Sequence, residues 1–344
     1  MIGRRLSWID QIANEKKSFL SPQIHKVTNG LRRLEERLFE SDNVALARLY
    51  LKARSAERRL IEGEMTLITI DEAVLWTYEW IKRFTSRYDL IVGIPRAGLL
   101  IGNVIACRLG IPLTTPDMFS DGRFWSGRML KQNQVFSDIL IVDETFRTGE
   151  SMERASEIVS RLAPDAKITR AALIFVGSRT AERQTEGLVD TYFRSVLPPY
   201  FFEWELMDEK PTDVIGMDLD GVICEECPSG SDDDELKYLN WLRNARSYLV
   251  PHYEVDFIVS NRLERYRTET EEWLRKQGIR YRELRLWDLE SKNERNGRWT
   301  ENKIEVLMAA KPDLFLESDD SQAMAIWSAT KIPTICTDKM ILYS

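Results

Sequence analysis

The segment that decides the fold of this chain is residues 139–151, which read ILIVDETFRTGES. It begins with a continuous apolar run, as expected for a strand that is buried on both faces of a parallel sheet. Two adjacent acids follow, and a short turn with hydroxyl groups then leads into a helix predicted over residues 150–162. A buried strand that passes through a polar turn into a helix is the repeating unit of α/β proteins.

The turn after this strand has the groups that a ribose 5-phosphate needs. The start of a helix presents unpaired N–H groups and the positive end of the helix dipole, and both favour a phosphate. Thr148 and Ser151 add hydroxyl donors, and Gly149 lets the backbone approach a ligand closely. The carboxylates of Asp143 and Glu144 can accept hydrogen bonds from sugar hydroxyls. The alternative is an ordinary strand, turn and helix with a favourable helix start.

A similar turn precedes this one in the chain. Residues 92–98 read VGIPRAG; they end an apolar run that begins at residue 88, and a helix is predicted over residues 99–109. Alone, this turn gives weak support for a phosphate site. At this spacing upstream of the acidic segment, it gives good support.

Together the two turns resemble those of the type I phosphoribosyltransferases, whose signature is four apolar residues, two acids and a turn ending in Thr-Gly-x-Ser/Thr. The resemblance implies that Asp143 and Glu144 hold the ribose hydroxyls of 5-phosphoribosyl 1-pyrophosphate (PRPP). It also implies phosphate and pyrophosphate contacts from Arg96, Ala97, Gly98, Arg147, Thr148, Gly149, Glu150 and Ser151. Arg147 stands where a small residue is commoner, and Ala97 replaces a frequent glycine.

Such a site needs little acid–base catalysis. Departure of pyrophosphate from C1 of the ribose gives an oxocarbenium-like transition state, so positioning and electrostatics dominate. The resemblance implies Mg²⁺ that bridges the PRPP oxygens. It also places the acceptor-binding hood at residues 200–204, where Phe202 and Trp204 would stack on a base, with core packing as the alternative. Residues 121–134 are either a mobile loop that closes over the site or an ordinary surface loop.

A second site is indicated by residues 214–223, which read VIGMDLDGVI. Asp218 and Asp220 occupy alternate positions at the end of an apolar strand, so their carboxylates point the same way. One carboxylate can attack phosphorus while the other handles protons, and Mg²⁺ can bridge the nucleophile and the substrate. Asp-x-Asp-Gly alone is moderately specific, since calcium loops and plain strand ends also contain it.

Three later elements complete a resemblance to the haloacid dehalogenase (HAD) superfamily over residues 211–344. Ser260 ends a predicted strand, Lys303 lies near the start of a predicted helix, and Glu317 to Asp320 follow another strand. The resemblance implies that Asp218 is the nucleophile and Asp220 the general acid and base. It makes Ser260 and Lys303 the phosphate ligands. A decayed HAD scaffold without activity is the alternative.

The same resemblance implies a metal site with Mg²⁺ held by Asp218, the backbone carbonyl of Asp220 and an acid of the last motif, Glu317 or Asp319. That motif reads ESDD, whereas the family usually has Glu-Asp or Gly-Asp. The insert between Asp220 and Ser260 is short, so we expect a small cap and an open site. An open site favours a tethered or macromolecular phosphorylated substrate over an enclosed small one.

Composition limits the classes of function. A net charge of −7 argues against a nucleic-acid coat, and no apolar run reaches the roughly 20 residues needed to cross a bilayer. Only two histidines are present, so the chemistry must use carboxylates, lysine, arginine and backbone amides. The four cysteines form no disulfide framework, and Cys224 and Cys227 lack partners for a zinc site. We therefore expect a cytoplasmic protein that does not enter a membrane.

The alternation of predicted strands and helices indicates the domain organisation of the chain. We expect an α/β protein with two doubly wound parallel-sheet (Rossmann-like) domains and an N-terminal helical extension. The ranges are 1–65 for the extension, 66–208 for the transferase-like domain and 211–344 for the HAD-like domain. The extension either packs on its neighbour or binds a protein partner. We also expect a homodimer, because this transferase family often pairs.

Two phosphate-handling sites on one chain suggest consecutive reactions. The first hypothesis is a bifunctional enzyme. One activity transfers ribose 5-phosphate from PRPP to an acceptor or catalyses the reverse reaction, and the other hydrolyses a phosphomonoester through an aspartyl-phosphate at Asp218. A second is a subunit that senses PRPP or a nucleotide in a larger bacterial assembly, such as an anti-phage defence system. A third is a HAD phosphatase with a non-catalytic transferase domain.

Overall fold

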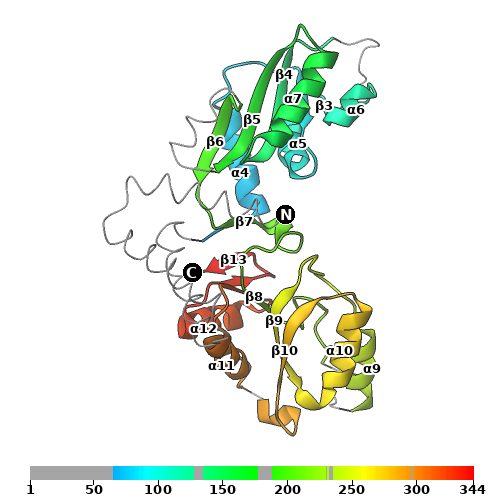
Figure 1. The fold of residues 1–344 in the computed structure, drawn as a ribbon, viewed down its shortest axis with the longest axis vertical. Coiled ribbons are helices and arrows are strands. Elements are labelled where there is room, and N and C mark those ends of the chain that lie inside the picture. The colour runs from blue at the N-terminus through cyan, green and yellow to red at the C-terminus, as the bar shows by residue number, and fades with distance from the viewer. Residues whose placement is uncertain (1–64, 128–134, 177–187, 230, 232–234, 296) are drawn as a thin grey trace, which may run out of the picture. The chain divides into compact units, whose positions relative to one another are not determined.

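The structure is a computed structural model that describes residues 65–127, 135–176, 188–229, 231, 235–295 and 297–344. The described chain forms two compact units, Leu67–Glu205 and Leu206–Ser344, which we call the first unit and the second unit (Figure 1). The predicted domain boundary at residues 208–211 falls just after the division between these units. The predicted helical extension lies outside the described residues, apart from Met65.

The first unit is built around a parallel sheet. Its strands lie in the order β3-β2-β4-β5-β6, and every neighbouring pair is parallel. A separate two-stranded sheet pairs β1 with β7. The elements are β1 (Thr66–Ile68), α4 (Ile70–Ile81), β2 (Leu90–Gly93), α5 (Ala97–Leu109), β3 (Leu113–Thr114), α6 (Pro116–Ser120), β4 (Asp138–Phe146), α7 (Glu150–Leu162), β5 (Lys167–Val176), β6 (Thr191–Val196), β7 (Tyr200–Phe202) and the 3₁₀-helix η1 (Glu203–Glu205).

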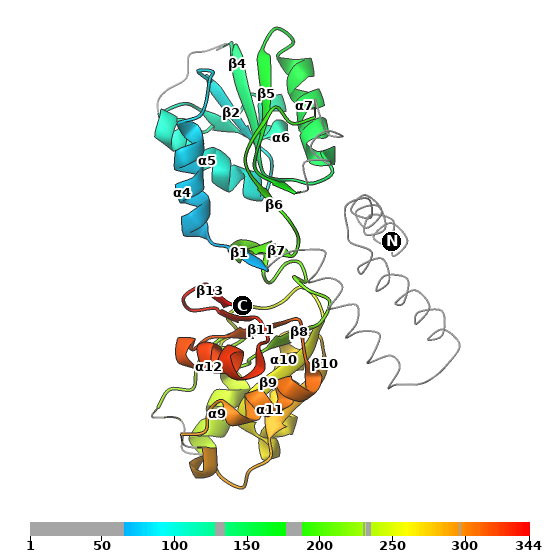
Figure 2. The same cartoon turned by 90° about the vertical axis from the view of Figure 1, so that its left-hand side faces the viewer.

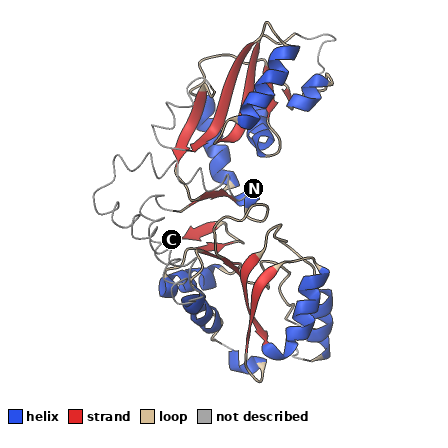
Figure 3. Cartoon of the chain, in the orientation of Figure 1, coloured by secondary structure: helices blue, strands red, loops and turns tan. Residues whose placement is uncertain are grey.

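Alternate residues of its central strands face two different cores. Leu140 and Val142 of β4 belong to one apolar cluster with residues of α4 and α5, whereas Ile139 and Ile141 belong to another with residues of α7. A strand places successive side chains on opposite faces, so continuous apolar strands fit only between two helical layers. Figure 2 shows α4 beside α5, and Figure 3 shows the sheet between helices.

The second unit contains a six-stranded sheet with the order β10-β9-β8-β11-β12-β13. All its neighbouring pairs are parallel except β12 with β13, which is antiparallel. Figure 1 shows α9 and α10 on one side of this sheet and α11 and α12 on the other. The elements are β8 (Ile215–Met217), α9 (Leu236–Asn244), β9 (Val255–Leu263), η2 (Glu264–Tyr266), α10 (Arg267–Lys276), β10 (Tyr281–Trp287), η3 (Lys292–Arg295), α11 (Glu301–Ala310), β11 (Leu314–Glu317), α12 (Asp320–Thr330), β12 (Thr334–Cys336) and β13 (Ile341–Tyr343).

The predicted α/β class with parallel sheets is confirmed in both units. The helix predicted over residues 150–162 has those bounds, and β4 continues beyond the apolar run that predicted it, to Phe146. Several elements had not been predicted, among them α4, β10 and α12. β10 is an edge strand whose exposed arginines interrupt the apolar pattern, which explains why that pattern did not indicate it. Within the described ranges, no helix is long and apolar enough to span a membrane.

Helix α5 lies very close to β4 because two glycines face the sheet. Gly98 and Gly102, one helical turn apart, are both buried. A Cβ atom at Gly98 would lie 2.8 Å from the Val142 carbonyl oxygen and 2.8 Å from Asp143 Oδ1. A Cβ atom at Gly102 would lie 3.2 Å from side-chain atoms of Leu113 and Val142. The start of α5 can therefore reach the end of β4 only with glycine at position 98.

We predict that Gly98→Ala destabilises the first unit by about 1–2 kcal/mol. Overpacking against backbone atoms costs about 1–3 kcal/mol, and the better helix propensity of alanine offsets up to about 1 kcal/mol of that. Gly127→Ala is the matched control, because a Cβ atom there meets nothing within 4 Å. Urea unfolding followed by circular dichroism measures both variants. Equal stability of the two would contradict the close contact between α5 and β4.

Candidate functional sites

The first candidate site lies at the carboxyl end of β4. This strand continues to Phe146, so Asp143 and Glu144 lie within it, and Asp143 is paired with Ala172 of β5. Both acids are half-buried. The end of β2 lies beside the end of β4, since Gly93 is paired with Val142. The structure thus brings the two predicted turns together at one edge of the sheet.

The turn between β4 and α7 is open to solvent. Arg147, Thr148, Glu150 and Ser151 are exposed, and Gly149 is the N-cap of α7 with φ 81°. That φ value lies in the left-handed region that glycine tolerates. A glycine N-cap has no side chain to accept from the first N–H groups of the helix. The predicted 5-phosphate turn is therefore placed at an accessible helix start.

Solvent exposure decreases along the predicted pyrophosphate turn, residues 96–98. Arg96 is exposed, Ala97 is half-buried, and Gly98 is buried against Asp143. Arg96 is also the N-cap of α5 and makes no side-chain capping bond. The first turn of α5 thus lies next to the predicted ribose-binding acids, as a ligand that joins ribose to pyrophosphate requires.

Burial raises the pKa of both Asp143 and Glu144. For Glu144, the hydrogen bond to Asp143 and the negative charge of Asp143 add to the effect of burial on its pKa. Asp143 Oδ1 also accepts from the Glu144 N–H at 3.0 Å. Two carboxyls this close keep a proton to higher pH than separated ones. The pair can then donate one hydrogen bond and accept others, which suits ribose hydroxyls.

The predicted acceptor residues lie in different environments. Phe202 is only 1% exposed and belongs to the core, so its ring is not available to stack on a base; the core-packing alternative fits this residue. Trp204 is half-buried and stacks on Phe202, with 4.6 Å between ring centroids. The residue that reaches the site is Tyr200, whose hydroxyl accepts from Arg147 Nη2 at 3.0 Å. Tyr200 lies two residues before Phe202, and therefore on the same face of a strand. This spacing could have indicated Tyr200 as a site residue.

The predicted closing loop is only partly described, because residues 128–134 lie outside the described residues. In the described part, Trp125 forms an antiparallel bridge with Leu113, with backbone bonds of 2.8 and 2.9 Å. Arg123 pairs with Asp121, and both side chains are exposed. This part of the loop is anchored to β3.

The second candidate site lies at the carboxyl ends of three neighbouring strands. Asp218 directly follows β8, Ser260 lies in β9, and Glu317 ends β11. In the sheet, Met217 is paired with both Ile258 and Leu316, which brings the following residues close together. Lys303, on α11, donates to Asp218 Oδ2 at 2.6 Å and to Glu317 Oε2 at 2.7 Å. Four of the predicted site residues are therefore gathered at this edge, although they are far apart in sequence.

Lys303 is the buried cation that joins two of these acids. Although burial opposes it, the charges of Asp218 and Glu317 raise the pKa of Lys303. Burial, together with the charges of Glu317 and Asp220, raises the pKa of Asp218. Both carboxylates also accept backbone N–H bonds, Asp218 from Leu219 at 2.8 Å and Glu317 from Ser318 at 3.0 Å. These contacts hold the predicted nucleophile in a fixed orientation.

The Asp220 carboxylate is held by an arginine that lies two residues after Ser260. Arg262 donates to Asp220 through Nε at 3.1 Å and through Nη2 at 2.6 Å, and its side chain is fully buried. Burial alone would raise the pKa of Asp220, but the charge and hydrogen bonds of Arg262 hold it below its usual value. Ser260 Oγ also donates to Asp220, at 3.3 Å. Ser260 and Arg262 lie two residues apart on β9. That spacing places their side chains on the same face of the strand and could have indicated that both reach Asp220.

Further residues support this arginine. Cys224 is buried between Asp220 and Arg262, and the Arg262 guanidinium lies 5.0 Å from the ring centroid of Trp241 on α9. Cys224 thus has a packing and hydrogen-bonding role. α9 lies within the insert for which we predicted a small cap, and residues 232–234 of that insert lie outside the described residues.

The acids predicted to bind a metal ion have other hydrogen-bonding partners in the structure. Lys303 bridges Asp218 and Glu317, Arg262 holds the Asp220 carboxylate, and Asp319 Oδ1 accepts from the Gln322 N–H at 2.8 Å as the N-cap of α12. In the part of the chain that the structure describes, no group of three or more His, Cys, Asp or Glu side chains is positioned to hold a metal ion. Two of the predicted ligand carboxylates, Asp218 and Glu317, are thus paired with the ammonium group of Lys303.

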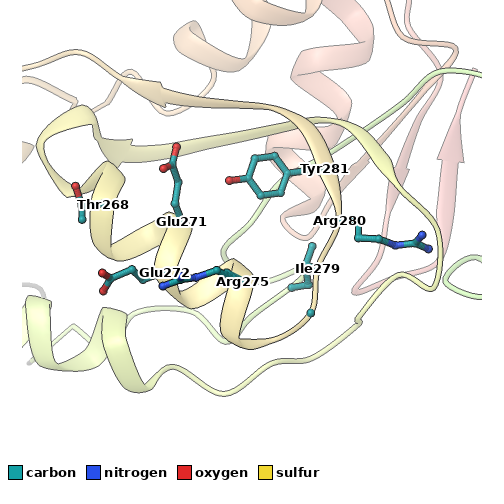
Figure 4. A pocket seen from close by; sticks show the side chains of 8 residues that line it. Thr268, Glu271, Glu272, Arg275, Ile279, Arg280 and Tyr281 are labelled. Carbon is teal, nitrogen blue, oxygen red and sulfur yellow. The ribbon is translucent and has the colours of Figure 1, made fainter.

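A shallow depression elsewhere on the second unit contains none of the predicted site residues. Figure 4 shows it between α10 and the start of β10. It is lined by Thr268, Glu271, Glu272, Arg275, Gly278, Ile279, Arg280 and Tyr281. Charges of both signs line it, and Glu271 is already paired with Arg267 at 3.1 Å.

Comparison with known proteins gives partial similarities. No family model matches the chain. Over 73 residues, 21% of this chain, it is 33% identical to the orotate phosphoribosyltransferase of Sulfurisphaera tokodaii, of which it spans 37%. Among solved structures, it is similar to the xanthine-guanine-hypoxanthine phosphoribosyltransferase of Helicobacter pylori, with 15% identity, a TM-score of 0.30 and coverage of 42% of this chain and 93% of that one. The purine phosphoribosyltransferase of Pyrococcus horikoshii gives 20% identity, a TM-score of 0.28 and coverage of 41% and 93%.

We predict that Arg262→Met destabilises the second unit by about 3–5 kcal/mol, because it leaves the Asp220 carboxylate without its buried partner. Urea unfolding at neutral pH measures the loss. The stabilisation of Asp220 by Arg262 is present above the unfolded-state pKa, about 4, and is lost as the pH falls through the lowered folded-state pKa. The difference between the variant and the wild type should therefore shrink in acid.

Arg243→Met is the control for this experiment. Arg243 pairs with Glu269 at 3.4 Å, but its side chain is 60% exposed. An exposed ion pair contributes about 0–1 kcal/mol, so this variant should remain close to the wild type. Equal effects of the two substitutions would show that Arg262 has no special role.

Proposed function

We propose that the first unit is a PRPP-dependent phosphoribosyltransferase. One observation carries the proposal: the helix start at Gly98 lies against Asp143, and the open turn at Gly149 follows the same strand. This arrangement offers separate places for pyrophosphate, ribose hydroxyls and 5-phosphate along one edge of the sheet. The segment that is 33% identical to an orotate phosphoribosyltransferase supports the same activity.

In this proposal, the residues act by positioning and charge. Asp143 and Glu144 orient the ribose, and residues 147–151 hold its 5-phosphate through N–H groups, hydroxyls and Arg147. Residues 96–98 bind the pyrophosphate, which leaves C1 with the electron pair of the C–O bond. The acceptor nitrogen or oxygen then forms the new bond to C1. Magnesium would arrive with PRPP, bound mainly by substrate oxygens and water.

For the second unit, we propose phosphoryl transfer to Asp218. The convergence of Asp218, Ser260 and Lys303 from separate elements favours it. An Asp218 oxygen would attack phosphorus, the ester oxygen would leave as the alcohol after taking a proton, and water would then hydrolyse the aspartyl-phosphate. Magnesium held by Asp218, the Asp220 backbone carbonyl and Glu317 or Asp319 would supply positive charge to the phosphoryl oxygens.

The two activities together would give consecutive reactions on a ribose phosphate, in which the second unit acts on the product of the first or on a related molecule. The division into a transferase-like domain at 66–208 and a HAD-like domain at 211–344 belongs to this proposal, as do a homodimer, a cytoplasmic location and a protein partner for residues 1–65. A nucleotide-sensing subunit would use the same sites without turnover. A phosphatase with a non-catalytic first unit would retain only the Asp218 chemistry.

We predict that the wild-type protein binds PRPP with Mg²⁺ and that the double variant Asp143→Asn/Glu144→Gln binds it at least about 100-fold more weakly. Each hydrogen bond to a charged group is worth about 1.5–3 kcal/mol, and 1.4 kcal/mol is tenfold in affinity. Calorimetric titration measures both proteins, with the exposed Asp165→Asn as the control. Absence of binding by the folded wild type would refute the transferase proposal.

We predict that Asp218→Asn lowers phosphate release from phosphomonoesters by at least about 1000-fold, since an amide cannot form the aspartyl-phosphate. A colorimetric phosphate assay over sugar phosphates and nucleotides measures it, with Glu272→Gln as an exposed control. Acid-trapped phosphoprotein should appear in the wild type and not in the variant. Turnover that survives the substitution would exclude Asp218 as the nucleophile.

A further inference from the structure

The phosphoryl transfer proposed for the second unit needs a group that gives a proton to the ester oxygen. The resemblance implied Asp220 for this task. In the structure, Arg262 donates to Asp220 through Nε at 3.1 Å to each oxygen and through Nη2 at 2.6 Å to Oδ1. Ser260 Oγ and Cys224 Sγ each donate to this carboxylate at 3.3 Å. A carboxyl group that only accepts hydrogen bonds has no proton to give.

Two other acids of this site are engaged in the same way. Asp218 is the proposed nucleophile, and it accepts from Lys303 Nζ at 2.6 Å and from the Leu219 N–H at 2.8 Å. Glu317 is fully buried, and it accepts from the same ammonium at 2.7 Å and from the Ser318 N–H at 3.0 Å. The proton for the ester oxygen must therefore come from a further group.

Glu226 brings another carboxyl group to this edge of the sheet. The chain turns back on itself after Asp220, because the Gly221 N–H donates to the Cys224 carbonyl at 2.7 Å. Glu226 follows this turn, and its Oε1 lies 2.7 Å from the position that a Cβ atom would take at Gly221. The missing side chain at position 221 thus leaves room for the Glu226 carboxyl group directly beside the residue that follows Asp220.

The Glu226 carboxyl group can be reached from solvent and can hold a proton. Glu226 is exposed, and it forms no hydrogen bond or ion pair with another described residue. Partial burial raises the pKa of Glu226 to about 7, and the negative charges of Asp220 and Asp218 contribute to that increase. A general acid is most effective when its pKa lies near the pH at which the enzyme works. Glu226 therefore combines access to the site with a suitable acidity.

We propose that Glu226 is the general acid and base of the second site. It gives its proton to the ester oxygen as Asp218 attacks phosphorus, and the bond between phosphorus and that oxygen breaks with its electron pair on the oxygen. The Glu226 carboxylate then takes a proton from the water that attacks the aspartyl-phosphate. This step releases inorganic phosphate and returns the electron pair of the broken bond to the Asp218 carboxylate. The inference rests on the proposed phosphoryl transfer and adds the residue that moves the proton.

Esters with different leaving groups test proton donation separately from a structural role. The p-nitrophenolate ion leaves without protonation, whereas the alkoxide of glycerol 3-phosphate needs a proton. Rapid acid quenching of the full chain with Mg²⁺ and each ester measures how fast phosphoprotein forms. We expect Glu226→Gln to slow its formation from glycerol 3-phosphate at least about 100-fold, and its formation from p-nitrophenyl phosphate by less than about threefold.

The second step gives an independent signature. Because the lost carboxylate also serves hydrolysis, Glu226→Gln should release p-nitrophenolate in a burst and then turn over at least about 100-fold more slowly than the wild type. The burst also shows that the variant is folded. Glu226→Asp keeps a carboxyl group on a shorter side chain and should recover at least about tenfold of the lost rate.

Glu225→Gln is the matched control. Glu225 is the neighbouring residue, and its carboxylate accepts from the Arg246 N–H at 2.9 Å. A glutamine oxygen can accept the same hydrogen bond. This variant should form and hydrolyse phosphoprotein at wild-type rates with both esters.

The outcomes separate this inference from the proposed function. If the wild type forms no phosphoprotein, or if Asp218→Asn retains turnover, the phosphoryl-transfer proposal fails and the inference fails with it. If turnover depends on Asp218 but Glu226→Gln cleaves both esters at wild-type rates, only the inference is overturned. Equal slowing with the two esters, without recovery in Glu226→Asp, would also overturn it, because a distorted site does not distinguish leaving groups.

Discussion

Both units depend on the constraint that a parallel strand buried on both faces has only its ends for polar side chains. In the first unit, the apolar run of β4 passes directly into Asp143 and Glu144, and in the second, β8 passes into Asp218. Parallel pairing then places the ends of neighbouring strands at one edge. Residues that are far apart in sequence meet there because their strands are in register, as Met217 with Ile258 and Leu316 shows.

The two edges handle charge in different ways. At the first, the acids share a half-buried position beside an exposed turn, where Arg147 bonds a tyrosine hydroxyl. At the second, two buried cations, Lys303 and Arg262, are each bonded to carboxylates. A buried charge is tolerated only with such partners. The first edge is thus arranged to receive a ligand at its surface, and the second is a closed ionic network.

The two edges therefore differ in how they can bind a phosphorylated ligand. An open helix start next to acids can bind a flexible, highly charged phosphate ester without rearrangement. In the network around Asp218, the lysine that bonds this carboxylate also bonds Glu317, so a phosphoryl group that entered would have to exchange contacts with that ammonium.

The sequence by itself determined the α/β class, the start and end of α7, and the placing of both acidic motifs at strand ends, because apolar runs, glycine and helix propensity act locally. It did not determine that Phe202 belongs to the core while Tyr200 reaches the site, or that Arg262 pairs with Asp220 across 42 residues. Nor did it show that Lys303 would bridge two predicted metal ligands. Those outcomes depend on which side chains meet when separate strands are packed together, and only the tertiary structure decides that.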